Sequence, residues 1–309
     1  MSFTRTMVHD LRTRLAGADP LPPPPPVPEI PFPPARVFPS PKRRTPFAAE
    51  AARHTTALVG IGHVGTRYAT DVVLQFQAEL AVAHGAVYTA LPEDWAAKQG
   101  LLPLQSRVTD HREFLLRPDL GRRLDAASVA RLRENARRGV DIQPILADGL
   151  SAVACMGSGM ALLDHFVKAC EALGFSVGTP VCARFARVWL EDEIGEVVGA
   201  KVSAILLGER PGLGTGDGLS AYLVYDPKIG KTDGDRNMMS NIHARGAPPE
   251  QAGKRLAALA GAMLTQRTSG VPLDLAPIRS DLGDAVVGGY PAPTPRVRLV
   301  SVGTAGETK

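Results

Sequence analysis

The segment of residues 201–218 constrains the fold more than any other part of the chain. Residues 202–207 form a short, mostly apolar run between Gly199 and Gly208, which is typical of a strand in a parallel sheet with both faces covered. The chain leaves this run through Glu209 and Arg210 and then places a glycine at every second position from Gly212 to Gly218. Glycine lets the backbone approach a ligand closely, and ligands bind beyond the carboxyl ends of such strands. The glycines alone are equally typical of a flexible surface loop, but the charged pair at the end of the strand favours a ligand-binding loop.

The second half of the chain alternates between strand and helix patterns. Strands are predicted at 142–147, 176–182, 202–207 and 220–225, and helices at 159–173, 190–198 and 248–264. This alternation predicts an α/β fold with a parallel sheet covered by helices. The preceding residues 45–139 show only helical patterns, at 48–58, 71–83, 93–99 and 126–138, and Asp125 is the candidate N-cap of the last of these.

The two ends of the chain differ in composition from its centre. Residues 2–15 fit a short amphipathic helix, and the proline-rich stretch 20–41 fits a polyproline II or disordered spacer. We therefore divide the chain into an N-terminal helix and spacer (1–44), a helical domain (45–139), an α/β domain (140–272) and a flexible tail (273–309). The N-terminal helix is either a docking peptide on a spacer or a terminus that binds nothing.

Composition excludes several classes of protein. A net charge of +4 without a basic block longer than three residues argues against nucleic-acid binding. The sequence contains no apolar run near the ~20 residues of a membrane span. Three cysteines without metal-ligand spacing favour a reducing cytoplasm and argue against a disulfide scaffold or a zinc site. No catalytic dyad or metal cluster is visible, so we predict a ligand-holding subunit without catalytic or metal-binding residues of its own.

Four further motifs each have two interpretations. The glycines Gly60, Gly62 and Gly65 have dinucleotide-fingerprint spacing, but the required second strand does not follow, so a nucleotide site is disfavoured. Asp148 and Ser151 either bind a ligand or form a turn and helix cap, and turns are the commoner case. The arginine-rich turn at 117–123 either holds an anion or forms an interface with a partner, which we favour. Asn241 and His243 precede the last helix, where a lone histidine is more often structural.

Taken together, the motifs resemble the small (light) subunit of ethanolamine ammonia-lyase, an adenosylcobalamin-dependent enzyme. The resemblance runs in order from about residue 60 to 243, and the segments that carry it are 60–68, LRPDLGRRL at 116–124, ADGLS at 147–151, VGTP at 177–180, GERPGLG at 208–214, 220–225 and SNIH at 240–243. It implies a helical N-terminal domain followed by a Rossmann-like α/β domain. It also implies a hetero-oligomer in which cobalamin lies between this chain and a large subunit that carries the substrate-binding and radical-handling residues.

The resemblance further implies three cobalamin contacts, at Val188, Glu209 and Met238. Glu209 lies in a motif that matches the family fully. Met238 replaces the cysteine typical of relatives, so a backbone contact would survive there while a side-chain contact is in doubt. Phe185 and Ala186 replace tyrosine and glycine without moving Val188.

The N-terminal extension of residues 1–44 bears on where the protein is located in the cell. Extensions like residues 1–44 direct some relatives into a bacterial microcompartment, which would add shell proteins as partners, whereas a proline-rich stretch can instead aid solubility.

The alternative function is a stand-alone nucleotide-binding α/β module or oxidoreductase, which would bind a nicotinamide cofactor without a partner chain. A third option is an assembly subunit that never touches the cofactor.

Overall fold

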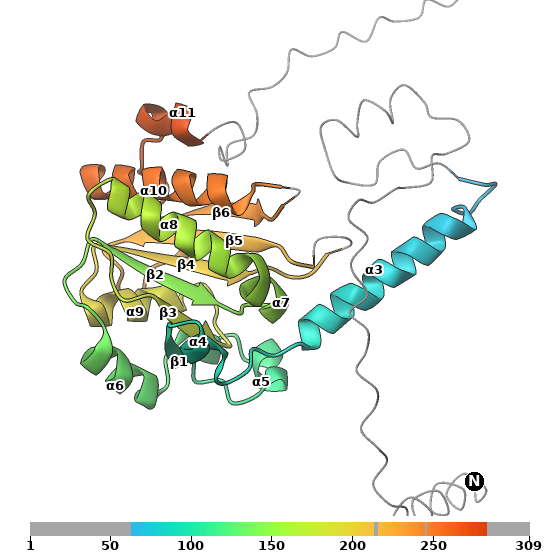
Figure 1. Cartoon of the computed structure of the whole chain (residues 1–309), viewed down its shortest axis with the longest axis horizontal. Helices are drawn as coiled ribbons and strands as arrows, with labels where there is room; N and C mark the ends of the chain where they lie inside the picture. The colour runs from blue at the N-terminus through green and yellow to red at the C-terminus, as the bar shows by residue number, and fades with distance from the viewer. Residues whose placement is uncertain (1–62, 213–215, 245, 283–309) are drawn as a thin grey trace, which may run out of the picture.

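A computed structural model of the chain describes residues 63–212, 216–244 and 246–282. Its centre is a six-stranded sheet with the order β1-β3-β2-β4-β5-β6 (Figure 1). The strands span Leu102–Gln105 (β1), Ile142–Ala147 (β2), Val181–Arg184 (β3), Val202–Gly208 (β4), Leu219–Tyr225 (β5) and Arg236–Ile242 (β6). The first four are joined by parallel pairing, and β5 and β6 are added by antiparallel pairing. The predicted α/β class with a mainly parallel sheet is confirmed.

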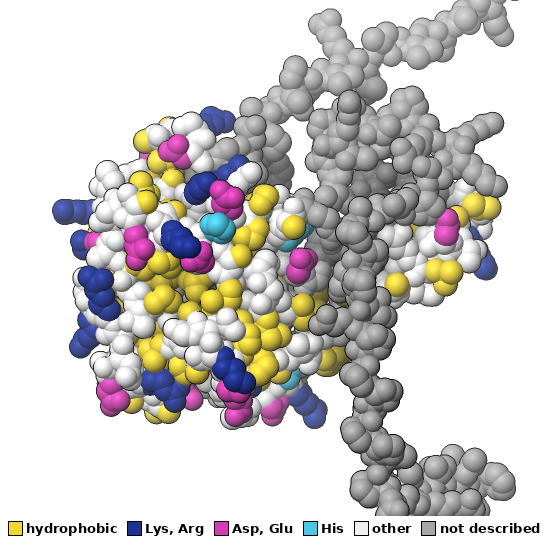
Figure 2. All heavy atoms as spheres, in the orientation of Figure 1, with side chains coloured by type: hydrophobic (Ala, Val, Ile, Leu, Met, Phe, Trp, Pro, Cys, Tyr) yellow, Lys and Arg dark blue, Asp and Glu magenta, His cyan; other side chains and the backbone are white. Residues whose placement is uncertain are grey.

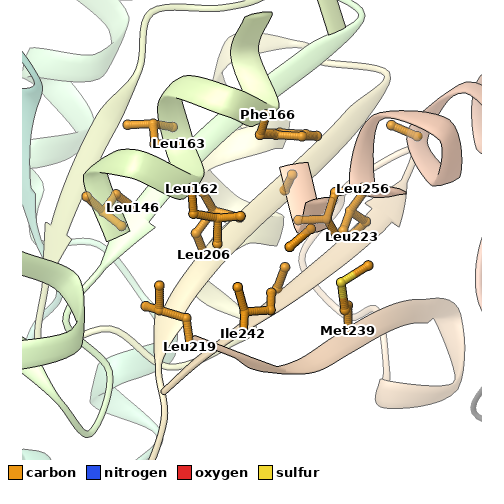
Figure 3. Close-up of a cluster of buried hydrophobic side chains, with 14 of the residues drawn as sticks. Leu146, Leu162, Leu163, Phe166, Leu206, Leu219, Leu223, Met239, Ile242 and Leu256 are labelled. Atoms are coloured by element: carbon orange, nitrogen blue, oxygen red, sulfur yellow. The ribbon is translucent and has the colours of Figure 1, made fainter. Parts of the chain in front are cut away.

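Helices cover both faces of this sheet. The helices α8 (Met160–Ala172) and α10 (Pro249–Gln266) pack against each other across one face, as Figure 1 shows. The helix α9 (Leu190–Val198) packs on β2 and β4 from the opposite side, with α6 (Ala126–Asn135) beside it. The first face buries the larger apolar core, in which Leu206 and Leu223 of the sheet meet Phe166 of α8 and Leu256 of α10 (Figure 3).

The periodicity of the sequence predicted most of these elements. All six residues of β2 are buried, as expected for a central strand covered on both faces. Predicted α8, α9 and α10 agree with the observed helices to within two residues at each end. The predicted strand 176–182 is displaced, because Val177 makes only an isolated bridge to Ile142 and the ladder begins at Val181.

Two predictions about the sheet were wrong. The fourth predicted strand, β5, pairs antiparallel with β4, because only residues 209–218 separate the two strands and a parallel crossover needs a dozen or more residues. The region 45–139 is not entirely helical, because β1 joins the sheet beside β3. Four residues with a proline, Leu-Pro-Leu-Gln, gave no strand signal. The polar strand β6 was not predicted either, since its buried residues Arg236, Met239 and Ile242 recur every third position around a bulge.

The remaining elements are short, apart from one long helix. That helix, α3 (Thr70–Tyr88), projects from the body of the molecule (Figure 1). The short elements are α4 (Trp95–Lys98), α5 (His111–Leu116), η1 (Leu120–Arg122), α7 (Ala152–Ala154), the π-helical η2 (Cys155–Gly159), η3 (Asp233–Asp235), η4 (Ala276–Ile278) and α11 (Arg279–Leu282). The predicted cap of α6 is confirmed, because the backbone N–H of Ser128 donates to Asp125 Oδ1 at 2.6 Å.

Both predicted terminal segments lie largely outside the described residues. The predicted amphipathic helix, the proline spacer and the predicted helix at 48–58 all precede the described residues. Within the predicted tail, η4 and α11 pack against α10, and residues after 282 are not described. The separation into a helical and a Rossmann-like domain stays a prediction. In the space-filling view, positive and negative side chains are interspersed around the body, with hydrophobic side chains over its centre (Figure 2).

Candidate functional site

The candidate site begins at the carboxyl edge of the parallel strands. Asp148 follows β2 and is 5 % exposed, and its two carboxylate oxygens accept the backbone N–H groups of Phe185 at 2.8 Å and Ala186 at 3.1 Å. Burial raises the pKa of Asp148 to about 6, although these backbone hydrogen bonds lower it. Asp148 thereby fixes the turn after β3, where Phe185 has a φ of 53°. Of the two interpretations of Asp148, the turn is the one that the geometry supports.

Ser151 and two glycines join this edge to the glycine-rich loop. Ser151 caps α7 by accepting the N–H of Ala154 at 3.1 Å, and its hydroxyl donates to the carbonyl of Gly216 at 3.0 Å. A Cβ at Gly208 would overlap the carbonyl oxygens of Asp148 and Ser151, and a Cβ at Gly149 would overlap the carbonyl of Gly208. Gly149 and Gly208 are therefore required, because the backbone after β2 packs closely against the end of β4. Residues 213–215 of the loop are not described.

Glu209 lies where β4 ends and is held in place by β5. Its backbone N–H donates to Gly218 at 2.9 Å, and its carboxylate accepts a hydrogen bond from the Ser220 hydroxyl. Tyr222 follows on the same face of β5, because side chains alternate along a strand. Burial raises the pKa of Tyr222, and Glu209 also raises it. Glu209 is thus oriented along the face of the sheet on which α9 packs.

Met238 extends the same face onto β6. It pairs directly with Tyr222 across the β5–β6 ladder, and it is 43 % exposed. Directly opposed residues in an antiparallel ladder point to the same face. Glu209 and Met238 therefore both border Tyr222, and the described residues leave this part of the sheet face partly open.

Val188 reaches the α9 side of the sheet from a different element. It lies in the turn between β3 and α9, half-buried, and its carbonyl accepts the N–H of Glu191 at 3.2 Å. The adjacent Trp189 donates its indole N–H to Asp233 Oδ1 at 2.6 Å, which joins this turn to the segment just before β6. The structure thus places Glu209 and Met238 on the α9 face of the sheet and Val188 in the turn that leads into α9. Glu209 and Met238 are near neighbours of Tyr222, whereas Val188 is linked to β6 through Trp189.

A buried ionic cluster, which was not predicted from the sequence, joins α9 to β6. Arg236 of β6 donates to Glu191 Oε1 at 2.6 Å and to Asp192 Oδ2 at 3.1 Å, and all three side chains are at most 2 % exposed. Burial raises the pKa of Glu191 well above its usual range and that of Asp192 to about 6, although Arg236 lowers both. Burial alone would lower the pKa of Arg236, but the two carboxylates raise it.

One arginine faces two buried carboxylates, and burial without full compensation favours the protonated form of an acid. Glu191 is the more deeply buried of the two acids, and each acid leaves one carboxylate oxygen, Glu191 Oε2 and Asp192 Oδ1, without a hydrogen-bond partner. The cluster fixes the first turn of α9, next to Val188, against the strand that carries Met238.

The arginine-rich turn packs mainly on the chain itself. Arg123 bonds Glu193 of α9 through Nε at 3.1 Å, and Arg117 pairs with Asp119 at the surface. The guanidinium of Arg122 lies 4.2 Å from the centre of the Trp189 ring. The favoured interpretation of this turn as a partner interface stays a prediction.

The other candidate motifs have structural roles or lie apart from the site. His243 is buried and its Nε2 lies 2.6 Å from Asn241 Oδ1, which agrees with a structural histidine. Gly60 and Gly62 are not described, and Gly65 sits in a turn before α3. The next strand after α3 is β1, but α3 projects from the body of the molecule (Figure 1) and does not cover the sheet as the helix of a βαβ unit would.

A pocket in the described part of the molecule is lined by none of the predicted contact residues. It has a volume of about 670 Å³ and is an open groove beside α6, with Arg107, Arg133 and Glu193 among its lining residues. Its openness and its distance from the converging elements make it a poor candidate for the site. Within the same ranges, no group of three or more His, Cys, Asp and Glu side chains could hold a metal ion. Nor does any described helix have the length and apolar character required to cross a membrane.

The fold and the site define a class of protein. It is an α/β protein whose sheet has a partly open face, bordered by an oriented carboxylate and a glycine-rich loop. Comparison with known families gives a narrower answer, because the model of the ethanolamine ammonia-lyase light chain (EutC) matches residues 47–274. That range is more than two thirds of the 309 residues, and the chain belongs to this family.

Proposed function

We propose that this chain is the cobalamin-contacting light subunit of an ethanolamine ammonia-lyase, which converts ethanolamine to acetaldehyde and ammonia. The family supports the lyase assignment. The observation that carries the cofactor assignment is the orientation of Glu209 by Ser220 along the sheet face that also presents Tyr222 and Met238.

The residues on this face suit a corrin ring. A corrin is a broad, flat group with an apolar surface and a rim of amide side chains. Tyr222 and the partly exposed Met238 offer an apolar surface on a flat sheet, and Glu209 offers carboxylate oxygens that accept hydrogen bonds from amide N–H groups. Val188 would add an apolar contact from the turn before α9. The side chain of Met238 is exposed, which makes a side-chain contact available where relatives have cysteine.

The part that this chain plays in the reaction is to bind and to orient. Adenosylcobalamin supplies the radical chemistry when it is bound, through homolysis of its cobalt–carbon bond. Glu209 would hold the rim of the ring, and the sheet face would exclude water from one of its sides. The substrate-binding and radical-handling groups would come from the large subunit, as the description of this family as a light chain implies. The complex would be a hetero-oligomer in which the partner completes the site.

Replacement of Glu209 tests the cofactor assignment. We expect Glu209→Ala to weaken adenosylcobalamin binding by about tenfold, because a hydrogen bond to a charged group contributes roughly 1.5–3 kcal/mol. The measurement is a spectroscopic titration of the purified complex with the large subunit, with co-purification as the check on assembly. Glu134→Ala, at an exposed position of α6, is the matched control. Unchanged affinity in the Glu209 variant would refute the proposed contact.

The nucleotide-binding alternative has less support. It depends on Gly60, Gly62 and Gly65, and the helix that follows them, α3, projects from the body instead of packing on the sheet as the helix of a βαβ unit would. It predicts that the chain alone binds a nicotinamide cofactor, which a titration followed by fluorescence would reveal.

We also propose that the N-terminal segment directs the complex to a microcompartment in the cytoplasm. This rests on the sequence of residues 1–44, which lie outside the described part of the structure. Deletion of residues 1–40 is expected to abolish co-sedimentation with shell proteins while leaving binding of the large subunit intact. Unaltered partitioning would favour a role in solubility.

A further inference from the structure

Three arginines gather around the turn that leads to Val188. Arg187 immediately precedes Val188, Arg210 immediately follows Glu209, and Arg122 lies on the turn before α6. The backbone N–H of Arg187 donates to Gly121 at 2.8 Å, which brings Arg122 next to it. Arg187 and Arg210 extend from the carboxyl edges of β3 and β4, the two strands that flank β2 (Figure 1). The three side chains therefore converge beside the proposed cofactor contacts.

Two of the three guanidinium groups are held flat on aromatic rings. Arg187 lies 4.1 Å from the centre of the Phe114 ring, and its Nη2 donates to the Phe114 carbonyl at 2.7 Å. Arg122 lies 4.2 Å from the centre of the Trp189 ring. Stacking immobilises a guanidinium while its in-plane N–H groups stay available, which is the geometry suited to an oxyanion.

These arginines have no carboxylate partner within the described ranges. Ion pairs occur there at Arg117, Arg123, Arg184 and Arg236, but at none of Arg122, Arg187 and Arg210. The Nε of Arg187 is buried and has no hydrogen-bond partner. Burial lowers the pKa of Arg187, and the charges of Arg122 and Arg210 lower it further, so both lie within electrostatic range of Arg187.

The nearby carboxylates do not neutralise the cluster. Asp148 raises the pKa of Arg187 by its charge, but both of its oxygens accept backbone N–H groups of the β3 turn. Glu209 is bonded to Ser220, and Glu93 pairs with Arg184. Three like charges held together by folding are unfavourable unless an anion compensates them.

We propose that Arg122, Arg187 and Arg210 bind the phosphodiester group of the cofactor. This inference rests on the proposed function. The phosphodiester in the nucleotide loop is the anionic group among the otherwise neutral amides of cobalamin, and arginine binds phosphate through paired, charge-assisted hydrogen bonds. The cluster lies between Val188 and Glu209 in the fold, so an anion bound there would belong to the same ligand that these two residues contact. Carboxylates of the large subunit are the competing occupant.

The test compares two ligands that differ in this group. Adenosylcobinamide retains the corrin ring but lacks the phosphodiester, the ribose and the base. The complex with the large subunit is titrated with each ligand by absorbance, for the wild type and for Arg187→Gln, Arg122→Gln and Arg210→Gln. Arg112→Gln, at an exposed arginine of α5, is the matched control. Arg210 is itself exposed, so its variant is expected to fold even if a substitution at Arg187 disturbs packing.

We expect each variant to lose about ten- to hundredfold in affinity for adenosylcobalamin and less than about twofold for adenosylcobinamide. Wild-type affinity for adenosylcobalamin should also decrease with salt more steeply than that for adenosylcobinamide. Equal losses for both ligands, no loss for either, or loss of subunit assembly would overturn the inference, and the last would assign the cluster to the partner's carboxylates. If the wild-type complex bound neither ligand, the proposed function itself would be wrong.

Discussion

Asp148 links the protonation state of one residue to the stability of the fold. Its folded pKa of about 6 lies above the ordinary value of 3.8, because burial disfavours its carboxylate. The folded chain therefore binds this proton more tightly than the unfolded chain between about pH 4 and pH 6. Since stability rises with pH only where the unfolded state binds more protons, the contribution of Asp148 decreases as pH rises through this window.

This sign gives a prediction for Asp148→Asn. The asparagine cannot ionise, so the wild-type free energy of unfolding minus that of the variant should fall by up to ~3 kcal/mol between pH 4 and pH 7. Asp192 and Glu191 titrate in both proteins, and their effects cancel in the difference. The measurement is urea unfolding followed by circular dichroism at several pH values. A difference that did not vary with pH would show that Asp148 titrates normally.

Replacement of Arg236 gives a second prediction for a single residue. Arg236→Gln should destabilise the chain by about 3–5 kcal/mol, because it leaves the carboxylates of Glu191 and Asp192 buried without their cation. Lys254→Gln removes an ion pair in which both side chains are more than half exposed, and it should cost less than ~1 kcal/mol. The readout is the denaturation midpoint in urea. Similar small losses for both variants would show that Arg236 is not needed to compensate the buried acids.

Single residues of the site were predictable only where the local sequence marks them. Glu209 stands out because an apolar strand ends beside it and glycines follow. Arg236 had no such signal, because its partners Glu191 and Asp192 lie 45 and 44 residues away along the chain. The arginine cluster was only partly visible, since the turn at 117–123 contributes Arg122 while Arg187 and Arg210 come from other loops. Contacts between distant segments require the fold to be known.

At the scale of elements, the junction of β2 and β4 depends on glycine. We expect Gly208→Ala to destabilise the chain by about 1–3 kcal/mol or more, because its Cβ would overlap the carbonyls of Asp148 and Ser151. Gly85→Ala in α3 is the control, since a Cβ there meets no atom within 4 Å. That substitution should raise helix stability by up to ~1 kcal/mol. Opposite signs in thermal unfolding would support this account, whereas a neutral Gly208 variant would show that the strands can separate without cost.

Element prediction succeeded where burial on both faces imposed one pattern. The strands β2 and β4 are short runs of mostly apolar buried residues, and the helices α8 and α10 bury apolar residues at helical spacing. That pattern does not specify the direction in which strands pair. β5 was therefore predicted correctly as a strand, but it pairs antiparallel with β4 instead of parallel. β1 is too short, and β6 too polar, to give a periodic signal. All three cases depend on the neighbouring strands more than on local sequence.

At the scale of the whole molecule, we propose that the chain holds a site that a large subunit completes. Its described residues provide an oriented carboxylate, a partly open sheet face and a cluster of arginines. This is consistent with a light chain of ethanolamine ammonia-lyase, the family to which residues 47–274 belong. The resemblance of several motifs in order predicted this family, which neither composition nor fold class could have specified.

The most direct test is reconstitution of the complete enzyme. The chain is co-expressed with an ethanolamine ammonia-lyase large subunit, the complex is purified, and adenosylcobalamin and ethanolamine are added while acetaldehyde is measured. We predict acetaldehyde from the complex and none from either chain alone. A chain that stayed apart from the large subunit, left the cobalamin spectrum unchanged and bound a nicotinamide cofactor instead would contradict the account.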